Sequence, residues 1–211
     1  MNNIEKIYSI LLTSYGPQGW WPLTPAGKTR TKHHSGKPKH DNERFEIMLG
    51  AILTQNTAWN NVEKALEQLH KSKLVRHDAL LKVSKDRIGK LIRSAGYYNQ
   101  KAERLVLVSR FVKEHGVKSL LAKDADSLRE MLLAVKGIGP ETADSIVLYA
   151  FGKPSFVIDA YTRRIFSRVG LCDAGVGYDE LQDMFVKNLA ADIDVYKEYH
   201  ALIVEHAKRH C

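Results

Sequence analysis

Two features between residues 132 and 165 have residue types suited to chemistry: a glycine turn, and an aspartate that precedes a helix. The turn contains Gly137 and Gly139, follows an apolar stripe at helical spacing, and precedes Pro140, which suits the first turn of another helix. We expect both glycines to adopt backbone angles that other residues avoid, so that several amide N–H groups point outward. Such amides beside a helix N-terminus bind phosphate. The sequence therefore predicts a helix, a phosphate-binding turn and a second helix.

A dinucleotide-binding loop is the competing interpretation of these glycines. Such a loop follows a strand and has a third glycine, whereas a helical pattern precedes this turn and Thr142 stands at the third position. We therefore reject a dinucleotide site.

Asp159 is the second feature. The helix after the turn is expected to end at Gly152, Pro154 prevents its continuation, and Asp159 then starts a new helix. As an N-cap, its carboxylate would accept backbone N–H bonds and remain ionised near neutral pH. An aspartate before a helix is usually only a structural cap, so a catalytic role depends on the motifs around it.

These motifs resemble the helix-hairpin-helix DNA glycosylases of the endonuclease III superfamily. VKGIGPETAD at 135–144 matches the hairpin, and VIDAYTRRI at 157–165 matches the segment with the essential aspartate. Two more segments are similar to the family, ERFEIMLGAILTQNT at 43–57 and AGYYNQKAERL at 95–105. The resemblance implies an enzyme that flips a damaged base out of double-stranded DNA, with Asp159 assisting cleavage of the glycosidic bond.

One residue departs from the family pattern. Bifunctional members carry a lysine immediately before the Thr-Ala of the hairpin helix, and this chain carries Glu141. A carboxylate cannot form the Schiff base that leads to strand cleavage, so the resemblance implies a monofunctional enzyme. Within that branch the chain looks most like the 3-methyladenine DNA glycosylases, which act on alkylated purines. A glycosylase for mismatched or oxidised bases and a non-catalytic helix-hairpin-helix DNA-binding protein stay open as alternatives.

The candidates for contacts with the flipped base are Trp20, Trp21, Pro22, Phe45, Glu141 and Lys208. The two tryptophans and the proline lie in a loop without helical periodicity, where the rings either stack on an extruded base or plug the space between domains. The phenylalanine fits a pocket or the apolar face of a helix. The two charged residues fit the pocket or a solvated helix surface. The resemblance favours the pocket for the tryptophans.

The candidates for other DNA contacts are Gln55, Asn56, Lys136, Gly137, Ile138, Gly139 and Thr142. Gln55 and Asn56 form either an ordinary polar turn or a wedge. By resemblance, Gln55 enters the space that the flipped nucleotide vacates, where its amide can bond to the orphaned base. The resemblance also implies that the backbone carbonyls of Leu133, Val135 and Ile138 hold a monovalent cation.

The overall charge favours a polyanionic partner. The 211 residues are 44% hydrophobic, enough for a core, and their formal net charge is +8. The basic segment from Lys28 to His40 is either a solvated loop or a contact to DNA phosphates, and its histidines lack the cysteines or carboxylates of a metal site. The sequence has no signal-peptide pattern or membrane-spanning run, so we expect a cytoplasmic protein, nucleoid-associated if bacterial. We also expect a monomer.

Cysteine usage bears on the cofactor. Only Cys172 and Cys211 occur, which indicates a reducing compartment. Many members of the family bind a four-iron cluster through four cysteines near the C-terminus, and Cys211 aligns with the first of them. Because one ligand cannot hold a cluster, we expect no iron-sulfur cluster and no cofactor other than the hairpin cation, unless the natural chain continues past Cys211.

The expected fold is all-α and bilobal. Periodicity indicates many short helices, including 59–70, 78–83, 85–95, 100–115 and 196–208, and no convincing strand. The resemblance implies their arrangement: residues 38–153 form a helical barrel that includes the hairpin, and residues 1–37 and 154–211 together form a second helical domain. It also places the active site in the cleft between them.

Overall fold

Helices make up the regular structure of the residues that the computed structural model describes, 1–33 and 36–211. In chain order they are α1 (Asn3–Tyr15), α2 (Asp41–Leu53), α3 (Trp59–Lys71), α4 (His77–Leu80), α5 (Lys85–Leu91), a 3-10 turn (Arg93–Ala95), α6 (Tyr98–His115), α7 (Val117–Ala122), α8 (Ala125–Leu133), α9 (Pro140–Ser145) with a π-helical turn (Ile146–Ala150), α10 (Ala160–Arg168), α11 (Tyr178–Asn188) and α12 (Ile193–His210). The prediction of an all-α fold is confirmed. None of these helices is long and apolar enough to cross a membrane.

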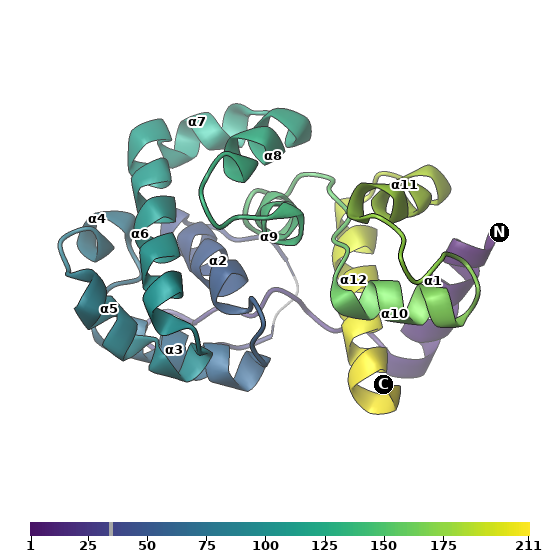
Figure 1. Ribbon diagram of the computed structural model, residues 1–211, viewed down its shortest axis with the longest axis horizontal. Coiled ribbons are helices and arrows are strands. Elements are labelled where there is room, and N and C mark those ends of the chain that lie inside the picture. The colour runs from purple at the N-terminus through teal and green to yellow at the C-terminus, as the bar shows by residue number, and fades with distance from the viewer. Residues whose placement is uncertain (34–35) are drawn as a thin grey trace.

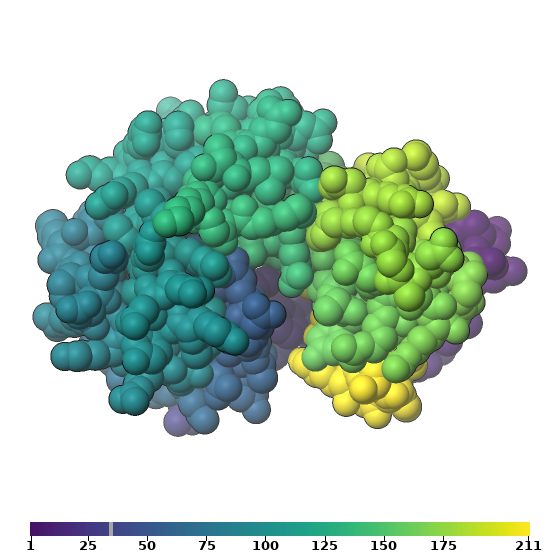
Figure 2. Space-filling view, in the orientation of Figure 1, coloured from purple at the N-terminus to yellow at the C-terminus, as the bar shows by residue number. Residues whose placement is uncertain are grey.

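The helices form two lobes (Figure 1). One contains α2 to α9, and the other contains α10 to α12 together with α1 from the start of the chain. In this second lobe the Tyr199 hydroxyl on α12 donates to the Ile4 carbonyl on α1 at 2.8 Å. Figure 2 shows a hollow between the lobes. The bilobal shape is as expected, and the ranges predicted for the two domains stay a prediction.

Helix α2 runs through the larger lobe and supports the loop that follows it. All residues from Phe45 to Leu53 are buried. Burying a Leu, Ile or Phe side chain contributes about 1.5–3 kcal/mol, so the end of α2 is firmly anchored. The buried Glu46 carboxylate also accepts hydrogen bonds from the Thr24 N–H at 3.0 Å and the Thr24 hydroxyl at 2.7 Å. This contact attaches the loop that contains the paired tryptophans to α2.

Lys101 on α6 anchors the loop after α2 from its other side. Its buried ammonium group donates to the Leu53 carbonyl at 2.9 Å, the Ala95 carbonyl at 2.7 Å and the Thr57 hydroxyl at 2.7 Å. Burial, helped by the charge of Arg104, lowers the pKa of Lys101 to about 8. The helix predicted over 85–95 ends at Leu91 because Ile92 leaves the helical conformation, with φ −98° and ψ 16°, and a 3-10 turn follows.

Other helix ends differ from the predicted ones by a few residues. The helix predicted over 78–83 is His77–Leu80, and the helix predicted over 100–115 starts at Tyr98. The last helix starts before the predicted residue 196, because the Asp192 carboxylate caps it by accepting from the Asp194 N–H at 2.8 Å and the Val195 N–H at 3.1 Å.

Candidate active site

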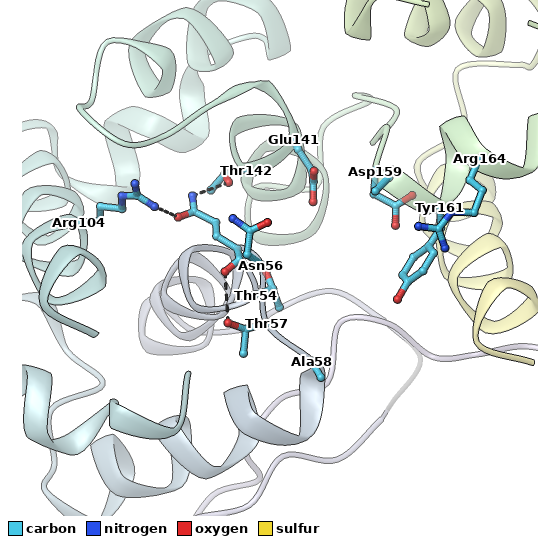
Figure 3. A pocket seen from close by; sticks show the side chains of 12 residues that line it. Thr54, Asn56, Thr57, Ala58, Arg104, Glu141, Thr142, Asp159, Tyr161 and Arg164 are labelled. Carbon is cyan, nitrogen blue, oxygen red and sulfur yellow. Dashed lines mark hydrogen bonds between the residues drawn. The ribbon is translucent and has the colours of Figure 1, made fainter. Parts of the chain in front are cut away.

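A cleft of about 580 Å³ lies between the lobes and gathers polar side chains from both (Figure 3). The loop between α2 and α3 and the start of α9 form one wall, and the start of α10 forms the facing wall. The predicted site residues on its lining are Gln55, Asn56, Glu141, Thr142 and Asp159. Residues far apart in the sequence therefore meet at this cleft.

Asp159 is the N-cap of α10, as predicted. Its Oδ1 atom accepts from the Thr162 N–H at 2.7 Å and from the Thr162 hydroxyl at 2.8 Å. The side chain is only 12% exposed, yet it lines both the cleft and a smaller cavity behind it. Both capping bonds engage Oδ1, so Oδ2 takes no part in the helix cap.

His200 on α12 is a site residue that the sequence analysis missed. Its Nε2 atom lies 3.7 Å from Asp159 Oδ2, and its Nδ1 atom lies 2.8 Å from the Tyr149 hydroxyl. The stripe of apolar residues in this helix reveals only its buried face, and no local signal indicates that His200 faces the start of α10.

The two acidic residues of the cleft have opposite pKa shifts. Burial acts to raise the pKa of Asp159, but His200 and the bonds from Thr162 outweigh it, so this pKa lies below its ordinary value. Glu141 stands across the cleft from Asp159 (Figure 3). Glu141 is exposed to solvent on one side, but desolvation of its carboxyl group by the surrounding protein raises its pKa, and the negative charge of Asp159 raises this pKa further. Asp159 is therefore the more readily ionised of the two carboxyl groups.

We expect His200→Gln to move the acidic limb of the pH–rate profile to higher pH. The imidazole lowers the pKa of Asp159, so its removal raises that pKa, and a reaction that needs the ionised carboxylate then loses rate at a higher pH. Single-turnover rates of base release over a pH series measure the limb. Glu141→Gln is the control for the other carboxyl group. An acidic limb at the same pH in folded His200→Gln protein would show that His200 does not act on Asp159.

Aromatic rings line the smaller cavity, whose volume is about 300 Å³. Trp20, Trp21 and Trp59 pack edge to face, with ring centroids 5.0 to 5.6 Å apart. Asp159 and His200 line the same cavity. A base that enters it would contact indole rings while its sugar lies near a carboxylate. The sequence analysis did not select Trp59, because its position at the start of a helix resembles an ordinary packing residue.

Only some of the remaining candidates for base contacts line the smaller cavity. Lys208 lines the smaller cavity, with its Nζ atom 5.7 Å from the centroid of the Trp20 ring. Trp21 is 5% exposed, so most of its ring belongs to the core. Phe45 is 2% exposed, packs against His77 and belongs to the buried face of α2, and its role in the pocket stays a prediction.

The role of Pro22 as a pocket residue likewise stays a prediction. It is buried, and it lines neither the cleft nor the smaller cavity. The two residues after it are held in place, because Leu23 pairs with Lys32 and the Thr24 N–H donates to Glu46 on α2.

The turn between α8 and α9 needs one glycine for its conformation. Gly137 has a φ of 88°, which favours glycine, and a Cβ atom there would lie 2.6 Å from Arg104 Nε. Gly139 has a φ of −96° and a ψ of 178°, and a Cβ atom there meets nothing within 4 Å. The expectation of special angles at both glycines is therefore wrong for Gly139. It is the N-cap of α9, and that position takes extended backbone.

Gln55 connects the loop after α2 to this turn. Its Nε2 atom donates to the Gly137 carbonyl at 3.1 Å and to the Thr142 hydroxyl at 2.9 Å, and its Oε1 atom accepts from Arg104. Asn56, the next residue, is exposed with a φ of 51°. Gln55 therefore lies along the cleft wall, and its entry into a duplex requires these bonds to break.

We expect Gly137→Ala to weaken binding of damaged and undamaged duplexes alike, by about tenfold, because the new methyl group displaces Arg104 and strains the turn. Gly139→Ala is the matched variant, and its loss should be clearly smaller because it meets neither obstacle. Titration of both duplexes by fluorescence anisotropy measures the effect. Equal losses for the two variants would contradict this account of the turn.

Other predicted residues of the hairpin remain unassigned in function. The Lys136 ammonium group pairs with Glu103 at 2.9 Å, and its side chain is 82% exposed. The Val135 carbonyl accepts from the Ile138 N–H at 3.0 Å, which still leaves a lone pair for a cation. The site for a monovalent cation, predicted from the backbone carbonyls of Leu133, Val135 and Ile138, stays a prediction. Within residues 1–33 and 36–211, no group of three or more His, Cys, Asp or Glu side chains is placed to hold a metal ion.

The basic segment 28–40 stays open between its two interpretations. Its residues 34 and 35 lie outside the part of the chain that the structure describes. Of the others, Arg30 lies 3.6 Å from Glu67 on α3.

Comparisons with known proteins agree with this geometry. The model of the HhH-GPD superfamily of base excision DNA repair proteins matches residues 49–190. A Methanocaldococcus jannaschii protein named as a candidate DNA repair glycosylase is 47% identical, over 99% of this chain and 88% of its own length. Endonuclease III of Thermotoga maritima is 30% identical, over 81% of this chain and 76% of its own.

Solved structures extend the comparison to the whole chain. A 3-methyladenine DNA glycosylase of H. pylori, bound to 1,N6-ethenoadenine, superposes with a TM-score of 0.78 and 27% identity, covering 100% of this chain and 99% of that one. An endonuclease III in a non-covalent DNA complex superposes with a TM-score of 0.76 at 19% identity, over 100% of this chain and 88% of that one, which shows a shared fold. Since the family match covers most of the chain and the M. jannaschii relative spans almost all of it, this protein belongs to the HhH-GPD superfamily of base excision repair DNA glycosylases.

Proposed function

We propose that this protein is a monofunctional glycosylase that hydrolyses the N-glycosidic bond of alkylated purines, with 3-methyladenine as its main substrate. The observation that carries the proposal is the cavity in which Trp20 and Trp21 lie beside Asp159. An adenine alkylated at N3 is a cation, and the face of an indole ring attracts cations. Its charge also makes this base a good leaving group, so its release needs no strong acid.

The chemistry then depends mainly on Asp159. Departure of the base leaves positive charge on the deoxyribose, which a nearby carboxylate stabilises strongly where water is excluded. Thr162 holds Oδ1, so Oδ2 is available to orient or deprotonate the attacking water. Glu141 occupies the hairpin position where a lysine would form a Schiff base, and its carboxyl group offers no amine. The product is an intact strand with an abasic site.

The relatives support the choice of lesion. The H. pylori protein is named a 3-methyladenine DNA glycosylase, and it holds a modified adenine in its structure. The endonuclease III relatives support only the broader class at this level of identity.

Release of free base from matched duplexes tests the substrate. We expect release from duplexes that contain 3-methyladenine, and much slower release from those that contain uracil in a mismatch or an oxidised base. Preferred release of uracil or an oxidised base would support a glycosylase of that specificity. Binding of all duplexes without any release would support a non-catalytic DNA-binding protein.

Trp20→Ala should reduce the preference for the cationic base. Loss of a stacking ring costs on the order of 1–3 kcal/mol, or about fivefold to 160-fold in the ratio of rates for alkylated and neutral bases. Phe45→Leu is the control, because this residue is buried outside the cavity. The ratio is measured by single-turnover release from both duplexes. A Trp20→Ala variant with the wild-type ratio would leave the ring as a plug between the lobes.

We also propose that the reaction proceeds without an iron-sulfur cluster. The support is the cysteine content: the 211 residues contain two, and a four-iron cluster takes four. Iron analysis of purified protein tests this point, and about four iron atoms per chain would contradict it.

A further inference from the structure

We propose that the buried Asp144 is a positioning residue that holds the segment 155–158 and thereby places Asp159 at the cleft. The proposal rests on the catalytic role proposed for Asp159. Asp144 lies on α9, the helix that also carries Glu141, whereas the segment 155–158 leads across to the second lobe.

The Asp144 carboxylate is the centre of a buried polar cluster. Its side chain is 0% exposed. Oδ1 accepts from Arg129 Nε at 2.8 Å and from the Ser155 hydroxyl at 2.6 Å. Oδ2 accepts from the Tyr178 hydroxyl at 2.8 Å and from Gln182 Nε2 at 3.0 Å. Four donors surround two oxygens, an arrangement that fits a carboxylate, which only accepts.

The partners of Asp144 hold the segment that precedes Asp159. The Ser155 hydroxyl bonds to Asp144 itself. Gln182 Nε2 donates also to the Phe156 carbonyl at 2.6 Å, and the Tyr178 hydroxyl accepts from the Ile158 N–H at 3.3 Å. The segment is thus attached at three points, the last of which is the residue directly before Asp159.

This segment needs such contacts because it has no helix or sheet of its own. Residues 156 to 158 are buried and lie outside regular structure, so their backbone groups depend on side chains for hydrogen bonds. Tyr178 and Gln182 come from α11 in the second lobe, and Asp144 comes from α9 in the first. The carboxylate therefore sets the position of Asp159 relative to the wall that carries Glu141.

Asp144→Asn and Tyr178→Phe test the proposal. The amide that Asp144→Asn introduces would turn an N–H toward two donors, and Tyr178→Phe removes the bonds to both Asp144 and Ile158. We expect both variants to slow single-turnover base release by about tenfold or more, with the Kd for undamaged DNA within about twofold of wild type. The matched control is Asp179→Asn. Asp179 also pairs with Arg129, at 3.0 Å, but it is 79% exposed and does not contact the segment, so its variant should release base at the wild-type rate.

Exchange of the Ile158 amide hydrogen, followed by NMR, gives a readout that is independent of activity. It should be slow in wild type and faster in Tyr178→Phe, with melting temperature recorded alongside. If folded Tyr178→Phe protein releases base within about threefold of the wild-type rate, the proposal is overturned, even if this variant is less stable than wild type. If Asp144→Asn does not fold, Tyr178→Phe decides the question by itself. A wild-type protein that releases no base from any duplex would instead contradict the proposed function, and the amide exchange would still decide whether the segment is held.

Discussion

Asp159→Asn is expected to lower the single-turnover rate of base release by about a thousandfold or more, or roughly 4 kcal/mol, while lesion-containing DNA still binds. Asparagine keeps the shape of the side chain and an oxygen that can accept the Thr162 N–H, so the start of α10 should be preserved. What it removes is the negative charge, in a site where the side chain is 12% exposed and charges are weakly screened.

Asp124→Asn is the matched control for this experiment. Asp124 caps α8 in a similar way, since its Oδ1 accepts from the Ser127 N–H at 2.7 Å and its Oδ2 accepts from the Ser127 hydroxyl at 3.0 Å. It lies outside the cleft and the smaller cavity. Both variants should therefore show the effect of a weakened helix cap, whereas only Asp159→Asn should show a large fall in the rate of base release. A rate for Asp159→Asn within about tenfold of wild type, a change of ~1.4 kcal/mol, would rule out the role assigned to this carboxylate.

The second prediction with a large effect is that this protein lacks strand-cleaving activity. Borohydride added during turnover should trap no protein–DNA adduct, and strand breaks should appear only after treatment with alkali. An adduct requires an amine that attacks the sugar carbon, and Glu141 stands where bifunctional relatives carry that amine. Water attack instead leaves an abasic site in an unbroken strand. Denaturing gels with and without alkali, and with and without borohydride, measure both outcomes.

The structure changes which lysine could contradict this prediction. Lys136 follows α8 before the glycine turn, is 82% exposed and lines neither the cleft nor the smaller cavity. Lys208 lines the smaller cavity together with Asp159, so of these two lysines it is the one placed at the proposed chemistry. A strong adduct that disappears in Lys208→Ala or Lys136→Ala would show a bifunctional enzyme. Glu141→Lys serves as a positive control, because it restores an amine at the position used by bifunctional relatives.

Features with a local cause were predictable from the sequence. The glycine turn, the helix after it and the cap at Asp159 each depend on residues within a few positions of one another, and all are present. Apolar spacing likewise revealed the helices, because burial of one face repeats with the helical turn. The same signal was ambiguous for Phe45, because spacing shows that a residue is buried without showing what covers it. Gly139 departed from its local expectation, because helix α9 begins directly after it.

Only the tertiary structure decided which distant residues meet Asp159. His200 faces it because α12 packs against α10, and Trp59 joins the paired tryptophans because the N-terminal loop returns to α3. The cluster around Asp144 depends on both lobes in the same way. These contacts arise from the packing of whole helices, which is set by many weak interactions along each face, and no short stretch of residues records them. The sequence by itself therefore determined the type of turn, the capped aspartate and the absence of a lysine at Glu141, whereas packing determined the environment that tunes and positions that aspartate.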